Sequence, residues 1–123
     1  MDRSDDAPLV KLTNAILLQS LKKGATQIRF RPPDEVSLLI DGVFQAELRP
    51  PPLVYAGIVR RLGVMASMPM RGRDEVAHSY VHIRIGRARE ARWAIEIAGH
   101  GPTLRAVLEA VAVDDRPAPP YRS

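Results

Sequence analysis

The sequence predicts an α+β domain in which an antiparallel sheet of about five strands is packed against helices. Three observations predict this class: three segments with helical spacing of apolar residues, strand pairs joined by short turns, and a length of 123 residues, which suits one domain. We expect the order α-β-β-β-α-β-β-α within a single domain over residues 8–113. Residues 1–7 are expected to form a disordered tail, and residues 114–123 a proline-rich tail.

The first helix is expected over residues 9–23, after Pro8, a residue that favours a helix start. Its apolar residues recur at helical spacing, and they are Leu9, Leu12, Ile16, Leu17 and Leu21. Gly24 accepts the left-handed conformation found just beyond helix ends. The helix is therefore predicted to end there.

Three strands are expected next. Residues 25–31 alternate, with Ile28 and Phe30 on one face and polar residues on the other, until Pro32 and Pro33 end the strand. Strands at 35–40 and 43–48 are joined by Asp41-Gly42, a dipeptide that forms tight hairpin turns. These segments predict a three-stranded antiparallel unit.

The second half is expected to hold a helix, two strands and a final helix. The first of these helices, over residues 53–67, follows the stiff Pro50-Pro51-Pro52 bridge, and residues 69–77 are expected to form a charged loop. Alternation predicts strands at 79–85 and 91–98 with a turn between them. A short helix over residues 103–113 is predicted from the spacing of Leu104, Val107, Leu108 and Val111.

Composition excludes several classes of site and location. The chain has no cysteine, so disulfides and thiolate metal sites are excluded. No apolar run approaches the ~20 residues that span a bilayer, and the polar start does not resemble a signal peptide. We therefore expect a cytoplasmic protein with no membrane insertion. No grouping of histidines and carboxylates has the spacing of a metal site, and we expect no cofactor.

Four segments resemble the domain that precedes the motor in hexameric type II secretion and type IV pilus ATPases. They begin with Pro8-Leu-Val-Lys-Leu-Thr-Asn-Ala-Ile-Leu-Leu, and continue with Ala25-Thr-Gln-Ile-Arg-Phe-Arg-Pro, Ile40-Asp-Gly-Val-Phe and Ile58-Val-Arg-Arg-Leu-Gly-Val-Met-Ala-Ser-Met. The segments follow the family's order and spacing over roughly residues 8–70. The resemblance implies a PAS-like sandwich of helices and sheet.

The sequence also departs from the family. Gln27, Arg29 and Arg31 stand at strand positions where the family has acidic or histidine residues, and Ser37 and Leu39 replace arginines that in the family reach nucleotide. No Gly-x-x-x-x-Gly-Lys-Ser/Thr phosphate loop occurs in the sequence. The resemblance therefore implies a non-catalytic module rather than an enzyme.

Arginines are the candidate contacts to a protein partner. The net charge is +4, and the second half is moderately basic. Arg29 and Arg31 reverse the charge that the family has at this strand, and Arg60, Arg61, Arg84 and Arg92 add a basic surface. The resemblance implies a partner such as a pilus or secretion ATPase or a motility regulator. A solvated surface with no partner is the alternative.

A second hypothesis is binding of a nucleotide or nucleic acid, for example a cyclic dinucleotide. Gly99, Gly101 and Thr103 precede the predicted final helix, and a glycine turn at a helix N-terminus can hold an anion. Aromatic residues make up only 5% of the chain, which disfavours base stacking and so disfavours nucleic acid.

Overall fold

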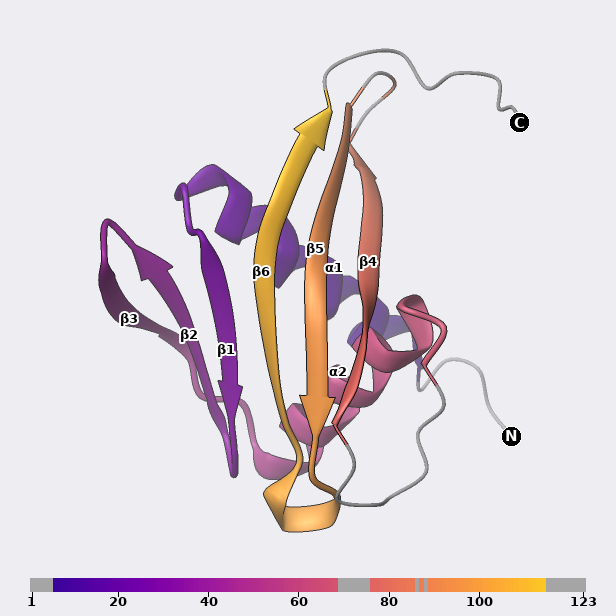
Figure 1. Cartoon of the computed structure of the whole chain (residues 1–123). Coiled ribbons are helices and arrows are strands. Elements are labelled where there is room, and N and C mark those ends of the chain that lie inside the picture. The colour runs from indigo at the N-terminus through magenta and orange to yellow at the C-terminus, as the bar shows by residue number, and fades with distance from the viewer. Residues whose placement is uncertain (1–5, 69–75, 86, 88, 115–123) are drawn as a thin grey trace.

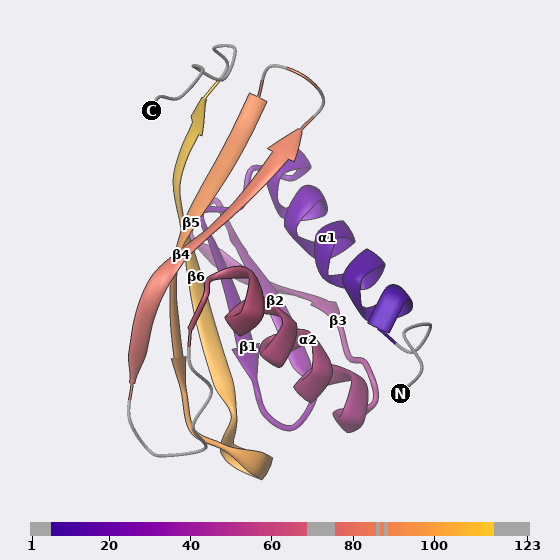
Figure 2. The same ribbon diagram turned by 90° about the vertical axis from the view of Figure 1, so that its right-hand side faces the viewer.

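The computed structural model describes residues 6–68, 76–85, 87 and 89–114. Two helices pack against one face of a six-stranded antiparallel sheet (Figures 1 and 2). The elements are α1 (Asp6–Lys22), β1 (Gln27–Arg31), β2 (Glu35–Ile40), β3 (Val43–Leu48), α2 (Pro52–Met65), β4 (Ala77–Ile85), β5 (Arg89–Ala98), a 3-10 turn (Gly101–Thr103) and β6 (Arg105–Asp114). The predicted α+β class is confirmed, with the order α-β-β-β-α-β-β-β.

Three expectations from the sequence fall largely outside the described residues. The expected N-terminal tail is described only at Asp6 and Ala7, which belong to α1. The expected loop over residues 69–77 is described only at its last two positions, and the expected C-terminal tail only at Asp114.

The strand order places the last strand at the centre of the sheet. From one edge to the other the order is β3-β2-β1-β6-β5-β4, so β6 lies between β1 and β5. Ile28 of β1 is opposite Leu108 of β6, and Leu108 is opposite Ile95 of β5. All three side chains are buried under the helices, so this row of apolar contacts joins the two halves of the sheet.

The final predicted helix is wrong, because residues 105–114 form strand β6. Leu104, Val107, Leu108 and Val111 do recur at helical spacing, but a period of two also runs through the segment. Leu104, Ala106 and Leu108 are buried, whereas Arg105 and Glu109 are exposed. The backbone N–H and C=O groups of β1 and β5 need hydrogen-bond partners. Because residues 105–114 pair with both strands, this segment forms a strand and not a helix. The sheet therefore has six strands instead of about five.

The turn between β2 and β3 forms as predicted. Asp41 and Gly42 both have positive φ, at 53° and 79°, and Ile40 pairs directly with Val43. This two-residue geometry matches the right-handed twist of paired strands. The hairpin places Phe44 beside Leu39 at the edge of the sheet.

Helix α2 is tied to the sheet through Tyr55. Pro52 is the first residue of the helix, a position where the missing N–H costs nothing. The hydroxyl of Tyr55, only 2% exposed, donates a hydrogen bond of 2.7 Å to the carbonyl of Leu104. Burial raises the pKa of Tyr55 well above its ordinary value, although the nearby charge of Arg105 opposes that shift.

Candidate protein-interaction surfaces

The open face of the sheet is the side that neither helix covers (Figure 2). In β1, β4 and most of β5, alternate residues point to it, while the residues between them are buried or half-buried beneath the helices. Its polar and aromatic side chains include Arg29, Arg31, Phe44, His78, Tyr80, His82, Arg84, Glu90, Arg92, Glu96, Arg105 and Glu109. The open face therefore extends over all six strands of the sheet.

Arg29 stacks on an aromatic ring instead of extending into water. Its guanidinium carbon lies 3.7 Å from the centre of the Phe44 ring, two strands away. Between them Ser37 is directly opposite Arg29 and donates a hydrogen bond of 2.9 Å to the carboxylate of Glu35. Arg31 is exposed at the end of the same strand, opposite Glu35. This edge of the open face therefore presents cations beside a partly exposed ring.

The other edge of the open face carries charges of both signs. Arg84 is opposite Glu90, and Arg92 is opposite His82. The guanidinium of Arg92 lies 6.0 Å from the centre of the Tyr80 ring, and Nδ1 of His82 lies 3.7 Å from a carboxylate oxygen of Glu90. Acidic side chains thus neutralise part of the basic surface that the sequence predicts here.

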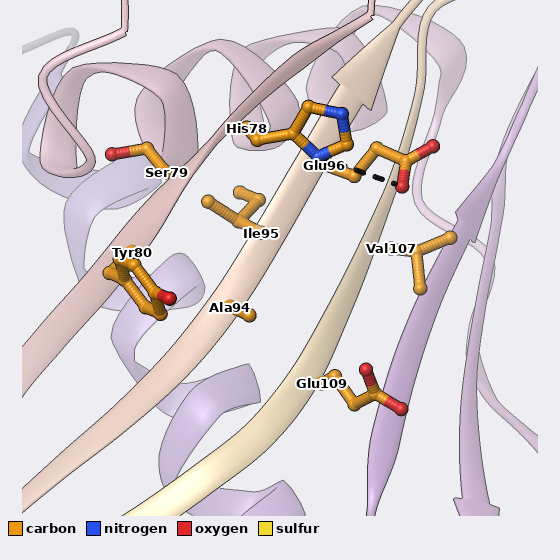
Figure 3. Close-up of a pocket in the computed structure, with 8 residues that line it drawn as sticks. All are labelled: His78, Ser79, Tyr80, Ala94, Ile95, Glu96, Val107 and Glu109. Atoms are coloured by element: carbon orange, nitrogen blue, oxygen red, sulfur yellow. Dashed lines mark ion pairs between the residues drawn. The ribbon is translucent and has the colours of Figure 1, made fainter.

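A hollow of about 310 Å³ lies toward the middle of the open face (Figure 3). Its lining includes His78, Tyr80, Ala94, Glu96, Val107 and Glu109. The small side chain of Ala94 stands between larger neighbours, and Nδ1 of His78 lies 4.0 Å from a carboxylate oxygen of Glu96. Two carboxylates at one hollow favour a basic group from a partner, which contrasts with the arginines at the sheet edges.

Sequence reasoning missed this hollow because it placed a helix at residues 103–113. Only a strand brings Val107 and Glu109 beside β5, where Glu96 is opposite Val107 and Ala94 is opposite Glu109. The signal that identifies the strand is the alternation of polar and apolar residues from Leu104 to Glu109.

Arg60 and Arg61 lie on α2, away from the other four predicted arginines. Together with Leu9 of α1 and with Gly57 and Val64 of α2 they line a hollow of about 270 Å³ on the helical side. Arg60 is exposed and Arg61 is half-buried. The Nε atom of Arg61 is buried and, among the described residues, has no hydrogen-bond partner. The six predicted arginines therefore fall on two separate surfaces.

The glycine turn at Gly99 and Gly101 does not precede a helix of any length. A 3-10 turn of three residues stands there, followed by β6. The Thr103 hydroxyl accepts a hydrogen bond from the backbone N–H of His100, and the N–H of Thr103 donates to the carbonyl of His100. The predicted anion site thus loses the helix N-terminus on which it rested, and these N–H groups are engaged within the turn.

The described residues contain neither a metal-binding cluster nor a membrane-spanning helix. No group of three or more histidine and acidic side chains is placed to hold a metal ion within that part of the chain. None of the described helices is both long and apolar enough to cross a membrane.

No protein-family model matches the chain. The type IV pilus assembly ATPase PilB of Myxococcus xanthus is 35% identical over 104 residues, which are 82% of this chain and 18% of that protein. The type II secretion system ATPase E of Vibrio cholerae is 30% identical over 105 residues, covering 82% of this chain and 21% of that protein. The chain is a relative of the N-terminal domain of these secretion and pilus ATPases.

A solved ATPase structure contains a similar fold. The structure of the Legionella pneumophila ATPase DotB matches with a TM-score of 0.62 at 9% identity, over 81% of this chain and 29% of that chain. At that identity the match concerns the fold alone. This relative of the secretion and pilus ATPases spans about a fifth of the length of the curated proteins that it matches. The matched segment carries no phosphate-loop motif, and its sheet presents one open face.

Proposed function

We propose that this chain is a non-catalytic interaction module that binds a protein of a pilus, secretion or motility system through the open face. The observation that carries the proposal is the arginine–aromatic pairing on an uncovered sheet: Arg29 lies over Phe44, and Arg92 lies beside Tyr80. Arginine and aromatic residues are enriched among the residues that dominate binding energy at protein interfaces.

The dimensions of the open face suit an interface of ordinary size. Six strands at a spacing of ~4.8 Å span about 24 Å, and the ten residues of β5 extend over about 33 Å. Even with shorter strands at one edge, the area is on the order of 600 Å², near the ~800 Å² that each partner contributes to a standard interface. The shallow hollow at Ala94 would seat a side chain of the partner.

The kinship with motor proteins supports an ATPase as the partner. The sequence retains the four family segments and has no phosphate loop, so the proposed role is docking on a motor subunit rather than ATP hydrolysis. Such a contact belongs in the cytoplasm, where we place the protein.

Binding to a purified pilus or secretion ATPase tests this proposal. We expect saturable binding of the full chain in biolayer interferometry, weakened at least about tenfold when Arg29 and Arg92 are both reversed to glutamate. Lys11→Glu provides the matched control, because Lys11 is an exposed cation on α1. Binding that survives the double reversal contradicts the assigned surface. A chain that binds neither such an ATPase nor another component of these systems contradicts the proposed function.

A further inference from the structure

We propose that the α1–α2 groove binds an acidic amphipathic helix of a partner protein. The α1–α2 groove is the hollow of about 270 Å³ lined by Leu9, Gly57, Arg60, Arg61 and Val64. Its lining residues belong to α1 and α2, the two helices that cover the other face of the sheet from the open face (Figure 2). The inference therefore concerns a second surface, and it goes beyond the function proposed for the open face.

One of the side chains that line the groove, Arg61, has an unsatisfied donor. The Nε atom of Arg61 is buried without a hydrogen-bond partner among the described residues. Buried polar groups in native proteins are nearly always paired, so each exception requires an explanation. A carboxylate in the groove would bind the Arg61 guanidinium in the planar, two-pronged geometry that such groups favour, and it would pair with Nε when the side chain turns outward.

The charge around the groove is complementary to an acidic partner. Arg60 and Arg61 form no ion pair with any residue that the structure describes. Helix α2 contains no aspartate or glutamate, and α1 contains only Asp6, its first residue. A second copy of this chain fits poorly, because a symmetric contact would bring two Arg60–Arg61 pairs together.

A stripe along α2 with an exposed apolar side chain at each end sets the length of the expected occupant. Leu53 is 87% exposed and Val64 is 61% exposed, and with Gly57 and Arg60 they recur along one line of α2. From residue 53 to residue 64 the stripe is about 16 Å long, or three helical turns. A Cβ on Gly57 would lie 2.9 Å from a methyl group of Leu9, so the glycine keeps the groove floor close to α1. A helix of three to four turns, with apolar residues flanked by carboxylates, matches this surface.

Selection from a phage-displayed library of helical peptides, panned on the full chain, tests the inference. We expect the enriched peptides to be acidic and to carry apolar residues at helical spacing. Fluorescence anisotropy with a synthetic copy of one enriched peptide measures its affinity. We expect Arg60→Glu and Val64→Asp each to weaken binding at least about tenfold. Both residues are exposed, so circular dichroism melting should show that the two variants remain folded.

Arg84→Glu is the matched control, because it reverses an exposed cation on the open face and should leave peptide binding unchanged. Basic or neutral enriched peptides, or no enrichment, would overturn the inference. So would peptides that respond to Arg84→Glu but not to Arg60→Glu, or a chain whose self-association is abolished by Arg60→Glu. None of these results bears on binding of an ATPase at the open face, which is tested separately by the Arg29 and Arg92 reversals.

Discussion

The two faces of the sheet differ in burial, although neighbouring residues of the same strands contribute to both faces. Phe30 and Trp93 are each 1% exposed beneath the helices, whereas Arg29 and Arg92, one position earlier, belong to the open face. Apolar burial on the covered face stabilises the fold, whereas Arg92 is exposed on the open face and Arg29 is half-buried there against the Phe44 ring. Strand alternation therefore places side chains that stabilise the fold directly next to side chains of the uncovered surface.

The largest expected effect comes from the covered face. Trp93→Ala should lower the free energy of unfolding by about 3–5 kcal/mol, because it removes the largest fully buried side chain and leaves a cavity. Arg92→Ala, at the adjacent position, should change that free energy by no more than ~0.5 kcal/mol. Urea denaturation followed by circular dichroism measures both. Equal losses of unfolding free energy for the two variants would contradict the different roles assigned to the two faces.

Two tyrosines, one buried and one on the open face, allow the two faces to be compared through the loss of a single hydroxyl group. Tyr55→Phe removes the hydrogen bond to the buried Leu104 carbonyl and should cost about 1–2 kcal/mol of stability. Tyr80→Phe acts on a side chain that is 53% exposed on the open face, and it should cost almost nothing. Urea titrations of the two single variants against the parent chain test this. A destabilising Tyr80→Phe would show that the open face contributes to stability.

The titration of Tyr55 gives this comparison a pH dependence. Because burial raises the pKa of Tyr55 in the folded state, the folded chain holds the phenolic proton at pH values where the unfolded chain releases it. Stability should therefore fall as pH rises above the ordinary tyrosine pKa of about 10, by up to about 1.4 kcal/mol per pH unit. Tyr55→Phe should remove that part of the decline, while Tyr80→Phe should leave it in place.

The smallest expected effect lies within the open face itself. A double-mutant cycle on Arg29 and Phe44 should give a coupling of about 0.5–1 kcal/mol in the free energy of unfolding, since the guanidinium lies 3.7 Å from the ring centre. The same cycle on Arg92 and Tyr80, separated by 6.0 Å, should give less than ~0.5 kcal/mol. A stronger coupling for Arg92 and Tyr80 than for Arg29 and Phe44 would contradict the expected dependence on the distance between guanidinium and ring.

Local signals predicted most of the fold. The Asp41-Gly42 turn, the alternation around Ile28 and the helical spacing before Gly24 each correspond to observed elements, because each depends on residues close in sequence. The same alternation buries Ile28 and Phe30 and leaves Arg31 exposed, but Arg29, which was also expected to be exposed, is half-buried because it stacks on Phe44.

Long-range pairing accounts for what sequence reasoning missed. The strand at residues 105–114 depends on β1 and β5, which come from distant parts of the chain, and its helical spacing gave the opposite prediction. The division of the arginines between two surfaces has the same origin. The sequence does not distinguish Arg60 from Arg92, but Arg60 lies on helix α2 and Arg92 lies on the uncovered side of the sheet.

The sequence by itself determined the local elements, the α+β class and the kinship with secretion and pilus ATPases, since turn chemistry, side-chain periodicity and short motifs are properties of neighbouring residues. Only the tertiary structure decided that the last segment is a central strand, that one sheet face stays open, and that Arg61 is left with a buried donor. These outcomes depend on which groups, distant in the sequence, form hydrogen bonds with each other and bury each other's apolar surface. Those pairings are fixed only when the chain packs.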